Sequence, residues 1–141
     1  MITKMPKFRA WDKFDKVMRE VTLLDYNHNF VGYSYPVFMK STMHMELMQS
    51  TGLFDKKGVE IFEGDIVKRD GVKRPEVVRF GEWTDVDSLG YKEQYIGFYF
   101  ESEHEGQEWL HSVQPQFNHL YKVIGNIYEN QELLENKGEE K

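Results

Sequence analysis

The first candidate chemistry lies in an acidic segment that also carries two histidines, His104 and His111. Histidine together with carboxylates is the ligand set that zinc or manganese requires. The spacing matches neither H-E-x-x-H nor a pair of histidines at helical spacing. We therefore interpret the segment as a solvated acidic loop and predict no metal there. The carboxylates that flank the histidines are Glu101, Glu103, Glu105 and Glu108.

Four of the chain's carboxylates have a second, structural interpretation. Asp65 follows Gly64, and Asp55 lies in the preceding turn; one carboxylate does not make a hard-cation site, which needs several oxygen ligands. We expect Gly64 to supply a turn and Asp65 to accept backbone N–H groups at a strand entrance. Glu101 and Glu103 would share one face of a strand, and two like charges side by side favour a wet surface over an acid–base pair.

Nucleophilic and nucleotide-dependent chemistry have no recognisable motif in the chain. The segment Gly32-Tyr33-Ser34-Tyr35-Pro36 lacks the second glycine of a nucleophile elbow, and nothing places a histidine near Ser34. Neither G-x-G-x-x-G nor a P-loop is present, and there are no cysteines. We therefore predict no catalytic residue and no cofactor, and we expect that the protein is not an enzyme.

Aromatic and basic residues suggest a possible binding surface. Tyr95 and Tyr99 would share the face opposite Ile96 and Phe98, and small barrels bind single strands by stacking bases on such rings beside a basic groove. The alternative is that the tyrosines cover a core or an oligomer contact, and the surrounding acidic residues favour this alternative because they oppose phosphate. The cations that would line the groove are Lys68, Arg69, Lys73, Arg74 and Arg79.

Charge and composition narrow the class of protein. The chain has 141 residues and a net charge of −6, which suits one domain or two small ones. Residues 82–111 hold eight acidic residues against Lys92 alone, a net charge of −7, which counts against nucleic acid. We find neither an apolar run long enough for a membrane helix nor a signal peptide. We therefore expect a cytoplasmic protein without a membrane partner.

Short apolar runs separated by turn residues predict a mainly β fold. Residues 7–24 suit a β-hairpin, residues 25–42 suit loop with short strands, and residues 43–48 suit a half-buried strand or a short helix. Further along, Asp70-Gly71 favours a tight hairpin turn, and Pro75 weakens the start of the next strand.

The rest of the chain continues this pattern. Residues 95–101 alternate so that Ile96, Phe98 and Phe100 would face inward, and residues 121–128 form another β-rich run. Asn130 can cap a last helical turn, and the polar residues 136–141 are expected to be disordered. Such strands from about Thr51 to Tyr128 favour a small closed barrel, which leaves no exposed edge.

Three segments in their order and spacing resemble the YopX family of phage and prophage proteins. Departures from the family pattern are small: Ser50 stands where an aromatic is common, and Gln131 where a proline is common. The segments are Lys7-Phe8-Arg9-Ala10-Trp11-Asp12, then the run from Leu47 through Asp55 to Val67, and Val123-Ile124-Gly125-Asn126-Ile127-Tyr128-Glu129-Asn130 with Leu133-Leu134.

The resemblance implies an organisation and an origin. It implies a smaller N-terminal β-hairpin region over residues 1–50, a small SH3-type β-barrel over residues 51–130 and a polar tail over residues 131–141. It also implies a phage or prophage source. The family has no established activity, so the resemblance supplies no catalytic residues.

Two hypotheses about function follow. The first is a noncatalytic phage accessory protein with a protein-binding or self-assembling surface, whose protein partner is unknown. The second is a nucleic-acid-binding module that uses the hairpin at residues 68–79. An enzyme with a metal in the acidic segment ranks last.

Overall fold

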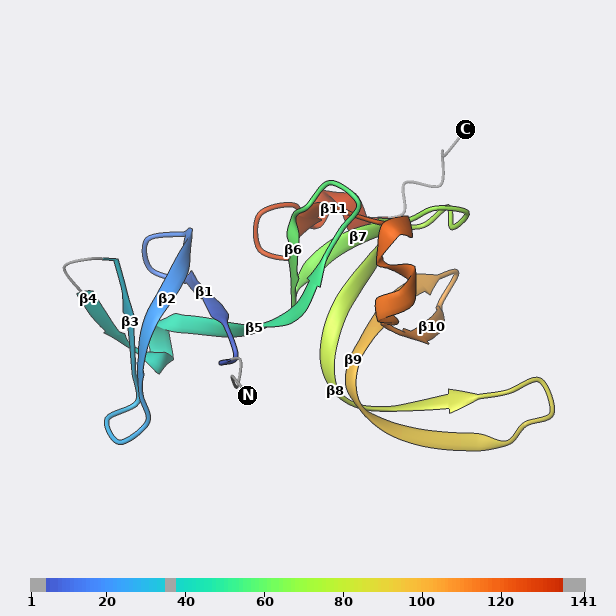
Figure 1. The fold of residues 1–141 in the computed structure, drawn as a ribbon, viewed down its shortest axis with the longest axis horizontal. Coiled ribbons are helices and arrows are strands. Elements are labelled where there is room, and N and C mark those ends of the chain that lie inside the picture. Colours follow the sequence, from blue (N-terminus) through green and yellow to red (C-terminus); the bar gives the residue numbers. More distant parts are fainter. Residues whose placement is uncertain (1–4, 35–37, 136–141) are drawn as a thin grey trace. The chain divides into compact units, whose positions relative to one another are not determined.

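The chain forms two compact units, Met1–Gly52 and Leu53–Lys141. The computed structural model describes residues 5–34 and 38–135, so the tail expected at residues 136–141 and Pro36 lie outside the described residues. Both units consist mainly of antiparallel strands (Figure 1). Each unit contains its own cluster of buried apolar side chains. The prediction of a mainly β fold is confirmed.

The first unit is a sheet of short strands in the order β4-β3-β2-β1-β5. The hairpin expected over residues 7–24 is confirmed, since β1 and β2 pair with Trp11 opposite Met18. Residues 25–42 contain two short strands, as expected. The strands of this unit are β1 (Phe8–Asp12), β2 (Val17–Asp25), β3 (Phe30–Tyr33), β4 (Phe38–Ser41) and β5 (Met45–Phe54), with a 3-10 turn η1 (Thr42–His44) before β5.

Strand β5 departs from the expected one-sided burial. The strand begins at Met45, because Met43 belongs to the 3-10 turn before it. Met45 and Met48 are both buried, while Leu47 is exposed. Residues three apart in a strand point to opposite faces, so β5 is covered on both sides at different points along its length. Met45 packs in the core of the first unit with Ala10 and Val31.

The second unit contains a five-stranded antiparallel sheet in the order β10-β9-β8-β7-β11. Its core consists of Ile61, Val67, Val78, Phe100 and Tyr121. Strand β5 continues into this unit, where β6 (Glu60–Phe62) is its neighbour. The remaining elements are β7 (Asp65–Arg69), β8 (Glu76–Val86), β9 (Lys92–His104), β10 (Gln107–Ser112), η2 (Pro115–Leu120), β11 (Tyr121–Asn126) and η3 (Gln131–Leu134).

The closed sheet expected from about Thr51 to Tyr128 is not observed. Within the part of the chain that the structure describes, β10 and β11 are the two edges of the five-stranded sheet and do not pair with each other. In the segment between them, Pro115–Leu120 forms η2 instead of a closing strand. The sheet is strongly curved, as β8 and β9 show in Figure 1, but it stays open.

Two predicted turns are confirmed in the second unit. Asp70-Gly71 forms a tight turn directly after β7, in which Gly71 has φ of 84° and the Val72 N–H donates to the Arg69 carbonyl at 3.0 Å. The hairpin itself is wider than expected, because residues 70–75 separate β7 from β8. Gly64 has φ of 89°, and the buried Asp65 carboxylate accepts the Phe62 N–H at 2.8 Å. Asp65 therefore has the structural role that the sequence indicated.

Strands β8 and β9 form a long ribbon with a glycine pair part-way along it. Gly81 lies opposite Gly97, with φ of 154° and 155°, values that side chains other than glycine rarely adopt. Facing glycines let a ribbon bend sharply, as at the corner of a small barrel. Beyond them, among the described residues, the ribbon consists of β8 and β9 alone, with Glu82–Val86 on one strand and Lys92–Ile96 on the other. We call residues 82–96 the arm.

The inward alternation expected for β9 holds only on the core side of the glycine pair. Phe100 is completely buried, and Phe98 is half-buried against the core. Ile96, predicted to face inward, is 79% exposed, because it lies on the arm, where none of the elements in the described residues covers that face. This prediction was wrong for Ile96.

Position 125 needs glycine because a side chain there would clash with Asn130, and not because of its backbone angle. It lies at the register shift where β11 pairs with β7, and a Cβ built there would lie 2.5 Å from the Asn130 Oδ1 atom. That oxygen accepts the Asn126 N–H at 3.1 Å. Asn130 is the N-cap of η3, as expected, but its side chain makes this bond instead of a capping bond.

We predict that Gly125→Ala lowers the free energy of unfolding of the second unit by about 1–3 kcal/mol, the usual cost of an overpacked site. The added methyl group must displace the Asn130 side chain and break its bond to Asn126. Amide hydrogen exchange of β7 and β11 measures the effect. Adding Asn130→Gly to Gly125→Ala removes the clash, so the two changes together should cost less than their sum. Strict additivity would contradict the contact.

Candidate functional site

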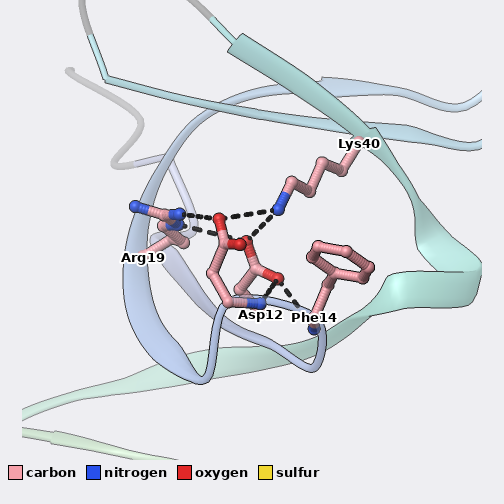
Figure 2. Close-up of polar contacts among 5 residues, drawn as sticks. Asp12, Phe14, Arg19 and Lys40 are labelled. Atoms are coloured by element: carbon pink, nitrogen blue, oxygen red, sulfur yellow. Dashed lines mark hydrogen bonds and ion pairs between the residues drawn. The ribbon is translucent and has the colours of Figure 1, made fainter.

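The Asp12 carboxylate, at the end of β1, accepts four hydrogen bonds (Figure 2). Asp12 is completely buried. Its Oδ1 atom accepts the N–H groups of Phe14 and Asp15 at 3.0 and 2.9 Å. Its Oδ2 atom accepts Arg19 Nε at 3.3 Å and Lys40 Nζ at 2.6 Å. This carboxylate therefore links the β1–β2 turn, β2 and β4.

Asp15 completes the cluster by sharing the same two cations. It accepts Arg19 at 2.7 Å and Lys40 at 3.0 Å, so two carboxylates face two cations. Burial alone raises the pKa of Asp12, but the hydrogen bonds from the Asp15 N–H, Lys40 and Arg19 outweigh it and lower the pKa from 3.8 to about 2. A carboxylate whose two oxygens are saturated in this way has no capacity left for substrate or metal, so its role is structural.

Asp55, the other aspartate considered as a metal ligand, is also saturated. Its carboxylate accepts the N–H groups of Lys57, Val59 and Val123 at 2.8, 2.9 and 2.8 Å. Burial raises the pKa of Asp55, and these three donors lower it by more, so the pKa lies below its usual value. The carboxylate therefore fastens the turn after β5 to β11.

The basic residues predicted to line a groove are mostly engaged within the chain. Arg69 pairs with the buried Glu76, with its second nitrogen at 3.0 Å from Glu76 Oε2, and its guanidinium lies over the Phe100 ring. Arg79 donates to Glu101 at 2.8 Å, and Lys68 donates to the Val72 carbonyl. A cation held in this way has less charge to offer a phosphate.

The two remaining cations of this group differ. Arg74 lies over the Trp109 ring at 6.0 Å, and its buried Nε atom has no hydrogen-bond partner among the residues that the structure describes. Lys73 is exposed in the β7–β8 loop. The structure therefore leaves Lys73 as the most accessible cation of the predicted groove.

The predicted tyrosines stack on a residue that the sequence analysis did not single out. Trp83 is buried, and its ring centroid lies 5.1 Å from that of Tyr95 and 5.6 Å from that of Tyr99. One ring face of each tyrosine is thus occupied by Trp83. The two tyrosines therefore cover Trp83, which is closer to the alternative of a covered core than to base stacking. Because Tyr95 lies on the arm and Tyr99 lies outside it, the stack also connects the arm to the rest of β9.

The acidic segment is a hairpin of β9 and β10, not the loop that we expected. Glu101 and Glu108 interact: burial raises the pKa of Glu101, but hydrogen bonds to Glu108 and Arg79 lower it below the usual value, while the bond to Glu101 raises the pKa of Glu108. His104 pairs in register with Gln107, and His111 with Phe100, so the two histidines lie at opposite ends of the hairpin. Among the described residues no three histidine or carboxylate side chains are placed to hold a metal.

A hollow of about 400 Å³ in the second unit is lined in part by Arg69, His111 and Tyr121. The polar atoms of two of these are already in use, since Arg69 pairs with Glu76 and the Tyr121 hydroxyl bonds the backbone of Gln114 at both N–H and carbonyl. We assign no chemistry to this hollow.

The arm is the feature that the sequence analysis missed. Leu89 is 80% exposed, Ile96 79% and Tyr91 70%, and Val86 is also exposed. Strand β8 pairs with β7 only at Glu76 and Val77, so its outer edge along the arm has no neighbouring strand within the described chain. The available signal was the run of apolar residues among the acidic ones at positions 82–96.

Comparison with known proteins agrees with the three segments noted in the sequence. The family model described as "YopX protein" matches residues 7–135, nearly the whole chain. The chain belongs to the YopX family. The crystal structure of protein EF1440 from Enterococcus faecalis resembles it with a TM-score of 0.50 and 30% identity, over 94% of this chain and all of that one. No curated protein matches this YopX-family chain.

Within the described part of the YopX-family chain, no helix is long and apolar enough to span a membrane.

Asp12→Asn should lower the free energy of unfolding of the first unit by roughly 3 kcal/mol at neutral pH. The variant replaces the buried carboxylate by a neutral amide, so Arg19 and Lys40 lose the negative charge with which they pair. Urea unfolding followed by the NMR signals of β1 and β2 measures the loss. Asp25→Asn is the matched control. Asp25 also accepts turn N–H groups, of Asn27 and His28, but it is not completely buried, so its loss should be much smaller.

The Asp12→Asn variant also tests how the stability of the first unit depends on pH. The folded-state pKa of Asp12, about 2, lies below the ordinary value of 3.8, so its stabilisation is complete above pH 3.8 and is lost as the pH falls through 2. The difference between the parent chain and Asp12→Asn should therefore shrink by about 2 kcal/mol between pH 7 and pH 2. A difference that stays constant over this range would contradict the role of the ionised carboxylate.

Proposed function

We propose that this YopX-family chain is a noncatalytic accessory protein that binds another protein through the arm. The observation that carries the proposal is the exposure of large apolar side chains at Leu89, Tyr91 and Ile96 on a ribbon of only two strands. Clustered exposed apolar groups mark interaction sites, and aromatic residues are enriched in them. The arm is also held in place before binding, because Trp83 stacks between Tyr95 and Tyr99. Such preorganisation lowers the cost of association.

We also propose, from the family resemblance, a phage or prophage origin and action in the bacterial cytoplasm. In the same way we relate the curved five-stranded sheet to an SH3-type barrel that stays partly open. The Gly81–Gly97 pair supports this relation, since small barrels turn their corners at such glycines.

A direct test places a photo-cross-linking amino acid at Leu89 or Ile96, in bacterial cytosol. We expect covalent adducts with a protein, identified by mass spectrometry, because both side chains are freely accessible. Val59 is the matched control, because it is exposed and apolar but lies in the turn after β5. Light scattering of the purified chain tests self-assembly at the same surface. A monomer whose arm positions give no more adduct than Val59 would refute the proposal.

Nucleic-acid binding is the alternative hypothesis, and the contacts of the basic residues decide which variant can test it. Arg69→Glu would place a second carboxylate beside the buried Glu76 and disturb the fold, so loss of binding would be ambiguous. Lys73→Glu changes an exposed side chain and is the cleaner variant.

We predict little retention of single- or double-stranded oligonucleotides even at low salt, because the nearby arginines are paired and the adjoining segment is acidic. Fluorescence anisotropy at several salt concentrations measures this. Salt-dependent binding by the parent chain that Lys73→Glu abolishes would favour the nucleic-acid hypothesis instead.

A further inference from the structure

We propose that the partner of the arm is a basic, extended protein segment that adds as a strand to the free edge of β8 at Glu82–Val86. This inference rests on the proposed function and names the chemistry of the partner. Exposed strand edges present unpaired N–H and C=O groups to which a further strand can bind.

The edge of β8 is the more open of the two edges of the arm. On β8, pairing with β7 ends at Val77, and one more bond joins the Val78 carbonyl to the Gly64 N–H. From Phe80 to Val86 this strand has neither proline nor lysine, the residues that natural proteins use to block an edge. On β9 the free edge is shorter, because β10 pairs from Tyr99 onward and the Val113 N–H reaches the Phe98 carbonyl. That edge also carries Lys92.

Charge selects a basic partner over a second copy of the arm. Residues 82–96 contain four acidic side chains and one lysine, so two arms pairing side by side would bring two net charges of −3 together. Glu82 and Asp85 lie on β8 itself, and both are exposed. Because Glu82 and Asp85 are three residues apart, the residues of a paired strand that lie next to them are also three residues apart. The best complement is therefore a strand with Lys or Arg at every third position and β-branched residues between them.

The test uses the full chain and a peptide of three Lys-Val-Thr repeats as the probe. In an NMR titration we expect the largest shifts at the amides of residues 82–86. Glu82→Lys combined with Asp85→Lys should weaken binding roughly tenfold, as the loss of two exposed ion pairs predicts. The control, Glu103→Lys combined with Glu132→Lys, makes the same change in net charge at exposed sites off the arm and should weaken binding about twofold at most.

A peptide with N-methyl groups on alternate residues separates strand addition from simple charge attraction, because it keeps the lysines and loses the N–H donors. We expect it to bind much more weakly than the unmodified peptide. Equal binding by the two peptides, equal weakening by the two double variants, or the absence of shifts in β8 would overturn the inference.

If the chain forms a dimer that depends on the arm and does not bind the peptide, the partner of the arm is a second copy of the chain and not a basic segment. That outcome would overturn the inference and leave the proposed function standing. The proposed function itself fails only if the arm positions give no specific adduct and the chain stays monomeric.

Discussion

In each of the two units, buried aspartates that accept backbone N–H groups stabilise the turns between strands. Asp12 fastens the β1–β2 turn, Asp55 the turn after β5, and Asp65 the entrance to β7. Small units can bury only a limited core, so the turns contribute much of what defines the strand register. A buried carboxylate is costly unless every oxygen is bonded, and for this reason these residues serve structure instead of chemistry.

The arm follows from the same small core. The interior of the second unit ends near Phe98, while β8 and β9 run on beyond the Gly81–Gly97 pair. A two-stranded ribbon in water is only marginally stable unless something holds it. In this YopX-family chain the stack of Trp83 with Tyr95 and Tyr99 provides that support. The apolar side chains further out have no such cover, and on this we base the proposal of a protein partner.

Local signals predicted the strands and turns well. Asp70-Gly71 and Gly64-Asp65 behave as their residue types indicate, because turn geometry depends on a few adjacent residues. The basic groove could not be judged in this way. Whether Arg69 is free or paired with Glu76 depends on two strands meeting, and no spacing along the chain reveals a buried ion pair. The same is true of Asp12, whose partner Lys40 is 28 residues away.

The amino-acid sequence by itself determined the mainly β fold and the positions of the tight turns, because alternation and turn chemistry act over a few residues. The order and spacing of three motifs also indicated the YopX family. Only the tertiary structure decided that the second sheet stays open, that Ile96 faces solvent and that most of the predicted groove cations are engaged. Those outcomes depend on which strands become neighbours and where the core ends. Both are properties of the packed chain and are not visible in any local stretch of it.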